Sequence, residues 1–275
     1  MSQLLAHPKT QESLDAVVSD PRACYMLVGA ARSGRLASAL YVATKLHCGA
    51  QAGCTGCKRI MAGTDPDVLR VSPNEKGTIT IEMAHNLVES LSKHPSRHGA
   101  TRIVIIESAE RMTIAAQNAL LKVIEEPPAH TLFFVLLENA AAVLSTIASR
   151  CQTIYVRPLM VGQGSPEVTR LARGRAGFIM ELASNPQLME SESELEAQAE
   201  ALFRANTFER MVLVDKLATD KHKDQILDWL AYRVSVAARQ QNGTSQALQS
   251  MQNYFIYSNA GVAGKHALME MMIRL

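Results

Sequence analysis

The sequence predicts an α/β fold with a parallel five-stranded sheet, helices on both faces, a short helical lid and an all-helical C-terminal domain. Three observations support this prediction. Short apolar or β-branched runs alternate with helical segments up to residue 157, a glycine- and serine-containing break follows Pro158, and no strand pattern recurs beyond about Ser191. Strands that alternate with helices of this length indicate βαβ units, whose parallel sheet is covered on both faces.

The first 157 residues contain five runs with the composition of strands and at least three helical segments between them. Helix 113–126 is the most clearly defined, because Thr113 can cap its first turn and Pro127 and Pro128 end it. The expected strands are Ala23–Val28, Asp67–Ser72, Arg102–Glu107, Thr131–Leu137 and Gln152–Val156, and the other expected helices are Leu36–Leu46 and Ile81–Lys93.

Beyond the break, the apolar residues recur at helical spacing only. We therefore divide the chain into an α/β domain at 1–157 with a cysteine-rich insert at 47–57, a short helical lid at 158–188 and a helical domain at 189–275. The expected C-terminal helices are Ser193–Ala205, Phe208–Ala218, Lys223–Gln240, Thr244–Ser258 and Ala263–Leu275.

Composition excludes several classes of protein. The chain has 275 residues, of which 47% are hydrophobic, enough for two or three packed domains. Its longest apolar runs, such as 132–137, are too short to span a bilayer, and residues 1–10 do not resemble a signal peptide. A net charge of +2 argues against a generally basic nucleic-acid-binding protein. Five cysteines without an export signal predict a cytoplasmic protein with reduced cysteines and no disulfide framework.

The loop at 29–36 has the glycine spacing of a phosphate-binding P-loop but lacks two of its functional side chains. Gly29 and Gly34 match the pattern G-x-x-x-x-G-K-[ST], whereas Arg35 and Leu36 replace the lysine and the hydroxyl residue. Leucine offers no oxygen to Mg²⁺, and the planar guanidinium does not replace a compact ammonium. A plain strand-to-helix turn that uses two glycines for tight geometry is the alternative.

The apolar strand at 102–107 ends where an ATPase of this type places a pair of acidic residues on Mg²⁺. Here the strand ends in Glu107 and Ser108, so the acidic pair is altered as well. A buried strand with a polar end would explain Glu107 equally well. Two altered sites in the expected order nevertheless favour a nucleotide-binding fold whose own ATP site is degenerate, so we expect this chain not to bind ATP well.

A third stretch is more specific. Residues 118–128, with the sequence NALLKVIEEPP, are followed by a strand and then by Ser149, Arg150 and Cys151. Together with residues 63–67 upstream, these motifs resemble the clamp-loader AAA+ family. The resemblance extends from about His7 to Val156 and is weak beyond Pro158.

The resemblance implies a non-catalytic, stator-like subunit of the bacterial DNA polymerase III sliding-clamp loader, which would be grouped with DNA-directed DNA polymerase only as a holoenzyme subunit. In this family the Ser-Arg-Cys motif carries an arginine finger, here Arg150, that acts on ATP bound by a neighbouring subunit. The alternative for Arg150 is a cation that complements a helix C-terminus.

The implied partners are ATPase subunits of the gamma/tau type and the clamp-opening delta subunit in a hetero-pentamer. The sliding clamp and primer-template DNA would be met through the complex, and no membrane is involved. The domain at 189–275 would form the oligomerisation collar.

Cys48, Cys54 and Cys57 form the pattern C-x₅-C-x₂-C, and thiolates at such spacing suit tetrahedral zinc. The family inserts a four-cysteine zinc module after the P-loop helix, and its fourth position falls at about Gln51. His47 could supply the missing ligand, although a neighbour of Cys48 need not point the same way. We favour a weak structural zinc site over a metal-free remnant.

The lid departs from the family in the same direction as the loop. Where related lids carry a sensor arginine, the turn at 174–177 places Gly177, and the lid looks a helix short.

Two other functions stay open. One is a divergent ATP-hydrolysing motor subunit in which Ser33 or Ser38 serves magnesium, and the other is a zinc-stabilised adaptor with this fold and no replication role.

Overall fold

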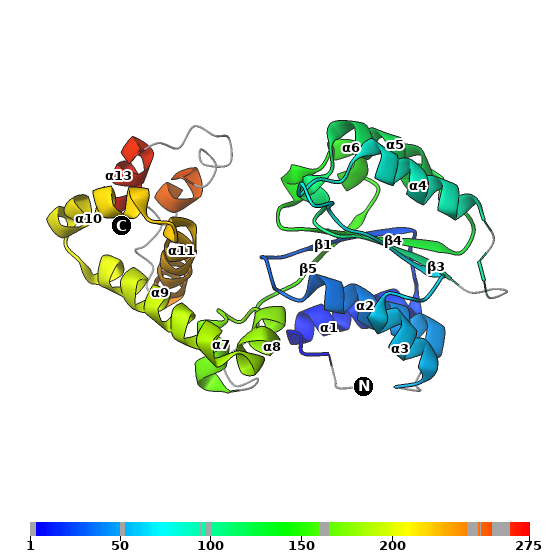
Figure 1. Ribbon diagram of the computed structural model, residues 1–275, viewed down its shortest axis with the longest axis horizontal. Coiled ribbons are helices and arrows are strands. Elements are labelled where there is room, and N and C mark those ends of the chain that lie inside the picture. Colours follow the sequence, from blue (N-terminus) through cyan, green and yellow to red (C-terminus); the bar gives the residue numbers. More distant parts are fainter. Residues whose placement is uncertain are drawn as a thin grey trace. The chain divides into compact units, whose positions relative to one another are not determined.

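The computed structural model describes residues 4–49, 53–93, 95–96, 101–159, 165–240, 247, 249–254 and 265–275 (Figure 1). The chain forms two compact units, residues 1–181 and 182–275. The division falls within helix α8, Ala176–Ser184. The functional boundaries that we expect at residues 157 and 188 stay predictions.

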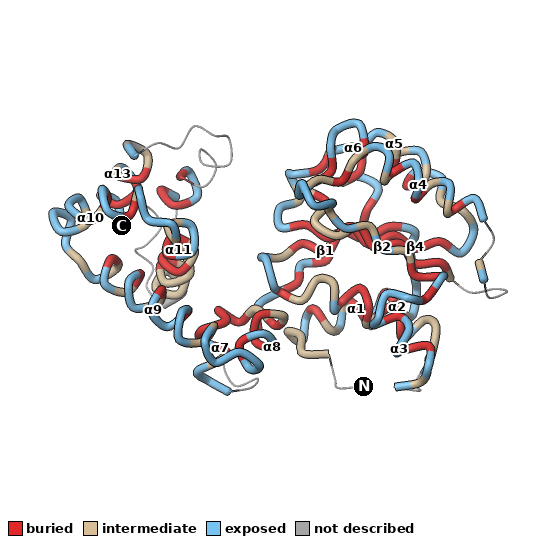
Figure 2. Tube along the Cα trace, viewed as in Figure 1, coloured by how far each residue is buried: buried red, intermediate tan, exposed pale blue. Residues whose placement is uncertain are grey.

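A five-stranded parallel sheet in the order β2-β3-β4-β1-β5 forms the centre of the first unit. Every residue of the three inner strands is buried, as the near-continuous apolar runs of a sheet covered on both faces require (Figure 2). The sheet confirms the predicted fold class, with some strand ends a residue shorter than expected. The strands are β1 Cys24–Val28, β2 Val68–Val71, β3 Arg102–Ile106, β4 Thr131–Leu137 and β5 Gln152–Tyr155.

Helices cover both faces of this sheet, and each face has its own apolar core (Figure 1). One core packs α1 (Pro8–Ser19), α2 (Arg35–Cys48) and α3 (Thr55–Ala62) against the sheet. The other packs α4 (Ile81–Ser92), α5 (Ile114–Glu125) and α6 (Ser145–Ala148) against the opposite face. The hydroxyl of Thr113 accepts the backbone N–H of Ala116 and so caps α5 as predicted. After the sheet the chain forms α7 (Pro166–Leu171) and then α8.

The described part of the second unit contains helices and no strand, as its sequence predicts, although the helix expected at 193–205 begins earlier, at Pro186. Helices α9 (Pro186–Arg204) and α11 (Lys223–Gln240) pack against each other. Nε1 of the buried Trp229 on α11 donates to Oε2 of Glu192 on α9 at 2.9 Å. The expected helix 244–258 lies largely outside the described residues, although 249–254 are helical. The elements are α9 Pro186–Arg204, α10 Thr207–Thr219, α11 Lys223–Gln240 and α13 Lys265–Ile273.

No helix among the described residues has the length and apolar character needed to cross a membrane.

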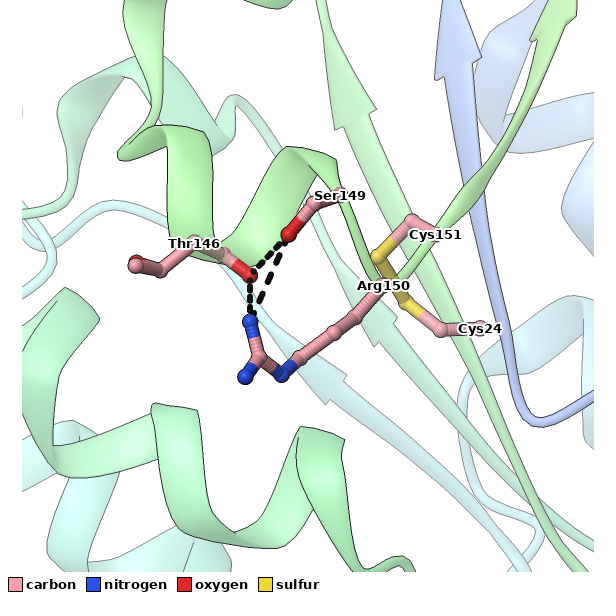
Figure 3. The surroundings of a disulfide bond; sticks show 5 residues. All are labelled: Cys24, Thr146, Ser149, Arg150 and Cys151. Atoms are coloured by element: carbon pink, nitrogen blue, oxygen red, sulfur yellow. Dashed lines mark hydrogen bonds between the residues drawn. A yellow bond between two sulfur atoms is a disulfide. The ribbon is translucent and has the colours of Figure 1, made fainter.

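One pair of cysteines corrects our expectation that the cysteines are reduced. Cys24, the first residue of β1, forms a disulfide with Cys151, which directly precedes β5 (Figure 3). The two strands pair in parallel, and this brings Cα atoms that are 127 residues apart in sequence to 4.6 Å. A cysteine count cannot reveal such a pair, because the proximity arises only when the sheet forms.

Candidate nucleotide loop, arginine finger and cysteine cluster

The P-loop-type turn joins β1 to α2 at the carboxyl edge of the sheet. Gly34 has φ of +97°, which suits glycine, and a Cβ on Gly29 would lie 2.8 Å from Oγ of Ser33. The guanidinium of Arg35 lies 3.6 Å from the carboxylate of Glu138, which follows β4. The arginine at the lysine position therefore has an acidic partner within its own chain.

Glu107, at the end of β3, is also paired internally. Nε and Nη2 of Arg70 on β2 donate to Oε1 of Glu107 at 2.9 and 2.7 Å. A metal ion would have to compete with the Arg70 guanidinium for this carboxylate, because hydrogen bonds between charged groups are strong. Ser108, in place of a second acid, has a left-handed backbone with φ of +49°.

The start of α8 packs directly on the backbone of the loop. The backbone N–H of Phe178 donates to the carbonyl oxygen of Arg32 at 3.1 Å, and the Arg32 guanidinium lies 4.6 Å from the centroid of the Phe178 ring. A Cβ on Gly177 would lie 2.8 Å from the same carbonyl oxygen, so no larger residue fits there without movement. A hollow of about 380 Å³ remains between the loop, Glu107 and α8.

Arg150 lies at the other edge of the sheet, between α6 and β5 (Figure 3). Its Nη1 donates to the carbonyl oxygen of Thr146 at 2.8 Å and to Oγ of Ser149 at 3.3 Å. Its Nη2 lies 2.6 Å from Oε1 of Glu125, the last residue of α5, and the side chain of Arg150 is 38% exposed. The contact with the Thr146 carbonyl oxygen is one that the helix C-terminus alternative would make, so this geometry alone does not decide between that role and a finger.

The three cysteines of the insert meet at the junction of α2 and α3. Their sulfur atoms all lie within 4.8 Å of one another, and those of Cys54 and Cys57 are 3.6 Å apart. Two sulfurs at about 2.3 Å from a tetrahedral zinc would be separated by about 3.8 Å, so the separation of the Cys54 and Cys57 sulfurs suits that ion. The backbone N–H of Cys57 lowers the pKa of the Cys54 thiol to about 7, whereas burial raises the pKa of the Cys48 thiol to about 12.

Neither of the two residues considered as a fourth ligand, His47 and Gln51, is found with the three sulfurs in the described structure. Nε2 of His47 lies 2.6 Å from the carbonyl oxygen of Thr101, so that nitrogen is engaged away from the sulfurs, and His47 is not part of the described cluster. Gln51, the other candidate position, lies outside the described residues. Sequence reasoning missed Gly56, on which a Cβ would lie 3.0 Å from Sγ of Cys48 and 3.5 Å from Sγ of Cys54. A glycine inside a C-x₂-C segment was the available signal.

The strand order, the glycine loop after β1 and the helical segment that follows β5 define the class of protein as AAA+. Within that class, the family model described as DNA polymerase III, delta subunit, matches residues 8–160. The chain belongs to this family.

Curated relatives bear the name DNA polymerase III subunit delta'. The relative from Escherichia coli K12 is 29% identical over 208 residues, which cover 70% of this chain and 61% of the relative. The relative from Bacillus subtilis 168 is 31% identical over 191 residues, covering 62% of this chain and 56% of the relative. The chain thus spans about three fifths of the length of these relatives.

Solved structures with a similar course of the chain have lower sequence identity to it than these relatives. A gamma-subunit-related protein of Thermotoga maritima has a TM-score of 0.45 at 16% identity, with 98% of this chain and 97% of that chain covered. The RuvB Holliday junction branch migration motor of the same organism has a TM-score of 0.48 at 10% identity, with 80% and 87% covered.

Proposed function

We propose that this chain is a non-catalytic delta-prime-type subunit of the DNA polymerase III sliding-clamp loader. In this proposal Arg150 acts as an arginine finger on ATP bound by an adjacent subunit. The observation that carries it is the placement of two features on one sheet. The P-loop-type turn lies at the carboxyl edge, after Val28, whereas Arg150 lies at the amino edge, beside Cys24.

The length of β1 separates these features. Five residues of a strand span about 16 Å at about 3.3 Å per residue, which is farther than an arginine side chain can extend. Arg150 therefore cannot serve a nucleotide in the loop of its own chain. A finger at this position must act in trans, on a molecule that docks against the amino edge of the sheet.

The loop supports the non-catalytic half of the proposal. The arginine at the lysine position is paired with Glu138, Glu107 is paired with Arg70, and α8 packs on the loop backbone at Gly177. A nucleoside triphosphate with Mg²⁺ would have to compete with these internal partners for Arg35 and Glu107, and Leu36 would offer the metal no oxygen.

Family membership supports the assembly. The relatives are named as subunits of DNA polymerase III, and the related proteins include a tau subunit of Salmonella typhimurium that is 28% identical over 145 residues. We therefore propose gamma/tau-type ATPase subunits and a delta subunit as partners, with the clamp and primer-template DNA reached through the complex. Residues 158–188 would form the lid and 189–275 the collar.

Reconstitution with such ATPase subunits tests the finger. An arginine finger raises the rate of phosphoryl transfer by about 10³–10⁵, so Arg150→Ala should silence the one ATP site that it serves while assembly is retained. The matched control is Arg111→Ala, which removes an exposed arginine near the carboxyl ends of the strands, and should leave the ATPase unchanged. An assembled complex whose DNA-dependent ATPase is indifferent to Arg150→Ala contradicts the finger.

The purified chain tests the non-catalytic half. We expect no ATP turnover and no heat of ATP·Mg²⁺ binding in titration calorimetry. Turnover that Glu107→Gln abolishes would establish the alternative of a divergent ATPase. Failure to assemble with any ATPase subunit would instead favour the adaptor.

We also propose that Cys48, Cys54 and Cys57 hold a structural zinc ion, which would fix the start of α3 against the end of α2. Metal analysis of protein prepared without chelator should find zinc at a substantial fraction of one ion per chain. Cys57→Ser should abolish it. Gly56→Ala should weaken it, because the added methyl group displaces the Cys48 sulfur. Preparations that are essentially free of zinc would leave these residues as a metal-free remnant.

A further inference from the structure

The guanidinium of Arg150 is held by its own chain at both terminal nitrogens. Thr146 and Ser149 of the preceding turn accept from Nη1, and Glu125 of α5 binds Nη2 at 2.6 Å (Figure 3 shows the first two). Glu125 is the only one of these acceptors that carries a formal charge. It therefore contributes the largest electrostatic part of the contact.

The position of Glu125 is unfavourable for a carboxylate considered on its own. It is the last residue of α5, where the negative end of the helix dipole repels an anion, and Glu126 follows as a second carboxylate at the C-cap. The guanidinium of Arg150 offsets this repulsion. No ion pair of Glu126 is described, although it neighbours Glu125 in sequence and is also exposed.

We propose that Glu125 is a positioning residue that holds Arg150 against its own chain until a phosphate of the neighbouring ATP displaces it. This inference rests on the proposed role of Arg150 as a finger. Both side chains are about 40% exposed, 38% for Arg150 and 41% for Glu125. Because exposed ion pairs are weak, a phosphate group with more negative charge can compete for the guanidinium. Glu125 would thus limit unproductive contacts of the finger without trapping it.

The first measurement uses the full-length chain alone. In arginine ¹⁵N NMR, rotation of the guanidinium of Arg150 should be faster in Glu125→Gln than in the unaltered protein. Glu126→Gln is the matched control, because it removes a carboxylate from the same turn and should leave the rotation unchanged. The Arg150 signal is assigned by its loss in Arg150→Ala.

The second measurement uses the reconstituted complex. At ATP concentrations below half-saturation, Glu125→Gln should raise the DNA-dependent ATPase about 1.4- to 5-fold, the factor that corresponds to one exposed ion pair. Combined with Arg150→Ala, the same substitution should have no effect, since the residue then has no finger to position.

The outcomes separate two failures. Unchanged rotation of Arg150 in Glu125→Gln, no increase of the ATPase, or an increase that persists in the Arg150→Ala background would overturn the role of Glu125 alone. An assembled complex in which Arg150→Ala itself changes nothing would overturn the arginine finger, and the role of Glu125 with it.

Discussion

Removal of the Cys24–Cys151 disulfide should destabilise the first compact unit and leave the second nearly unchanged. The bond closes a loop with a sequence separation of 127 residues. In the chain-entropy description a loop of that length restricts the unfolded chain by about 5 kcal/mol, and measured effects of single disulfides are typically about 2–4 kcal/mol. We therefore expect Cys24→Ala to lower the free energy of unfolding of the first unit by about 2–5 kcal/mol.

Two probes distinguish the units in one urea titration. The sole tryptophan, Trp229, is fully buried in the second unit, so its fluorescence should report a nearly unchanged midpoint. Hydrogen exchange of the β1 and β5 amides should report a midpoint lower by about 1–2 M urea. In the unaltered protein, a reductant should lower the urea midpoint of the β1 and β5 amides by a similar amount. In Cys24→Ala the reductant should not lower that midpoint further, which shows that the other cysteines are not responsible for the effect.

Two results would refute this reasoning. Five free thiols per chain in protein purified without reductant would show that the bond does not form. Equal stability of the first unit with and without a bond that mass spectrometry has verified would show that loop closure does not contribute as calculated.

Two more predictions follow from single contacts. Gly177→Ala should lower the free energy of unfolding of the first unit by about 1 kcal/mol. A Cβ 2.8 Å from the Arg32 carbonyl oxygen costs about 1–3 kcal/mol, and the better helix propensity of alanine returns only about 1 kcal/mol. Urea unfolding measures this difference, and a gain in stability would contradict the prediction. In metal-free protein, the rate of Cys54 alkylation by iodoacetamide should increase as the pH rises through about 7. The thiolate is the nucleophile, and the backbone N–H of Cys57 lowers the pKa of the Cys54 thiol to about 7. Cys48, whose pKa burial raises to about 12, should react slowly over the same range, and equal rates for the two thiols by mass spectrometry would contradict the assignment.

The candidate site was predictable from the sequence only at the level of residue types. The glycine spacing located the turn after β1, and Arg35, Leu36 and Glu107 marked the positions that differ from the P-loop and acidic-pair patterns. The sequence did not reveal the partners of these side chains. Glu107 is bound by Arg70, 37 residues earlier, and Arg35 by Glu138 at the end of another strand. Such partners are neighbours only because parallel strands end at the same edge of a sheet.

The cysteines illustrate the same division. Cys48, Cys54 and Cys57 lie close in sequence, so their spacing predicted a cluster, and their sulfurs do meet. Cys24 and Cys151 lie far apart, and no local pattern related them, so our expectation for that pair was wrong. Local spacing determines what one helix turn or loop brings together, whereas strand pairing determines contacts over more than a hundred residues.

The sequence by itself thus determined the fold class, the order of strands and helices, the cap at Thr113 and the family. These properties depend on apolar periodicity and short motifs, which act over a few residues. Only the tertiary structure decided which charges are paired, that Gly177 lies against the loop, and that Arg150 and the loop lie at opposite edges of one sheet. These relations depend on strand register and packing, because they join residues that the chain itself keeps far apart.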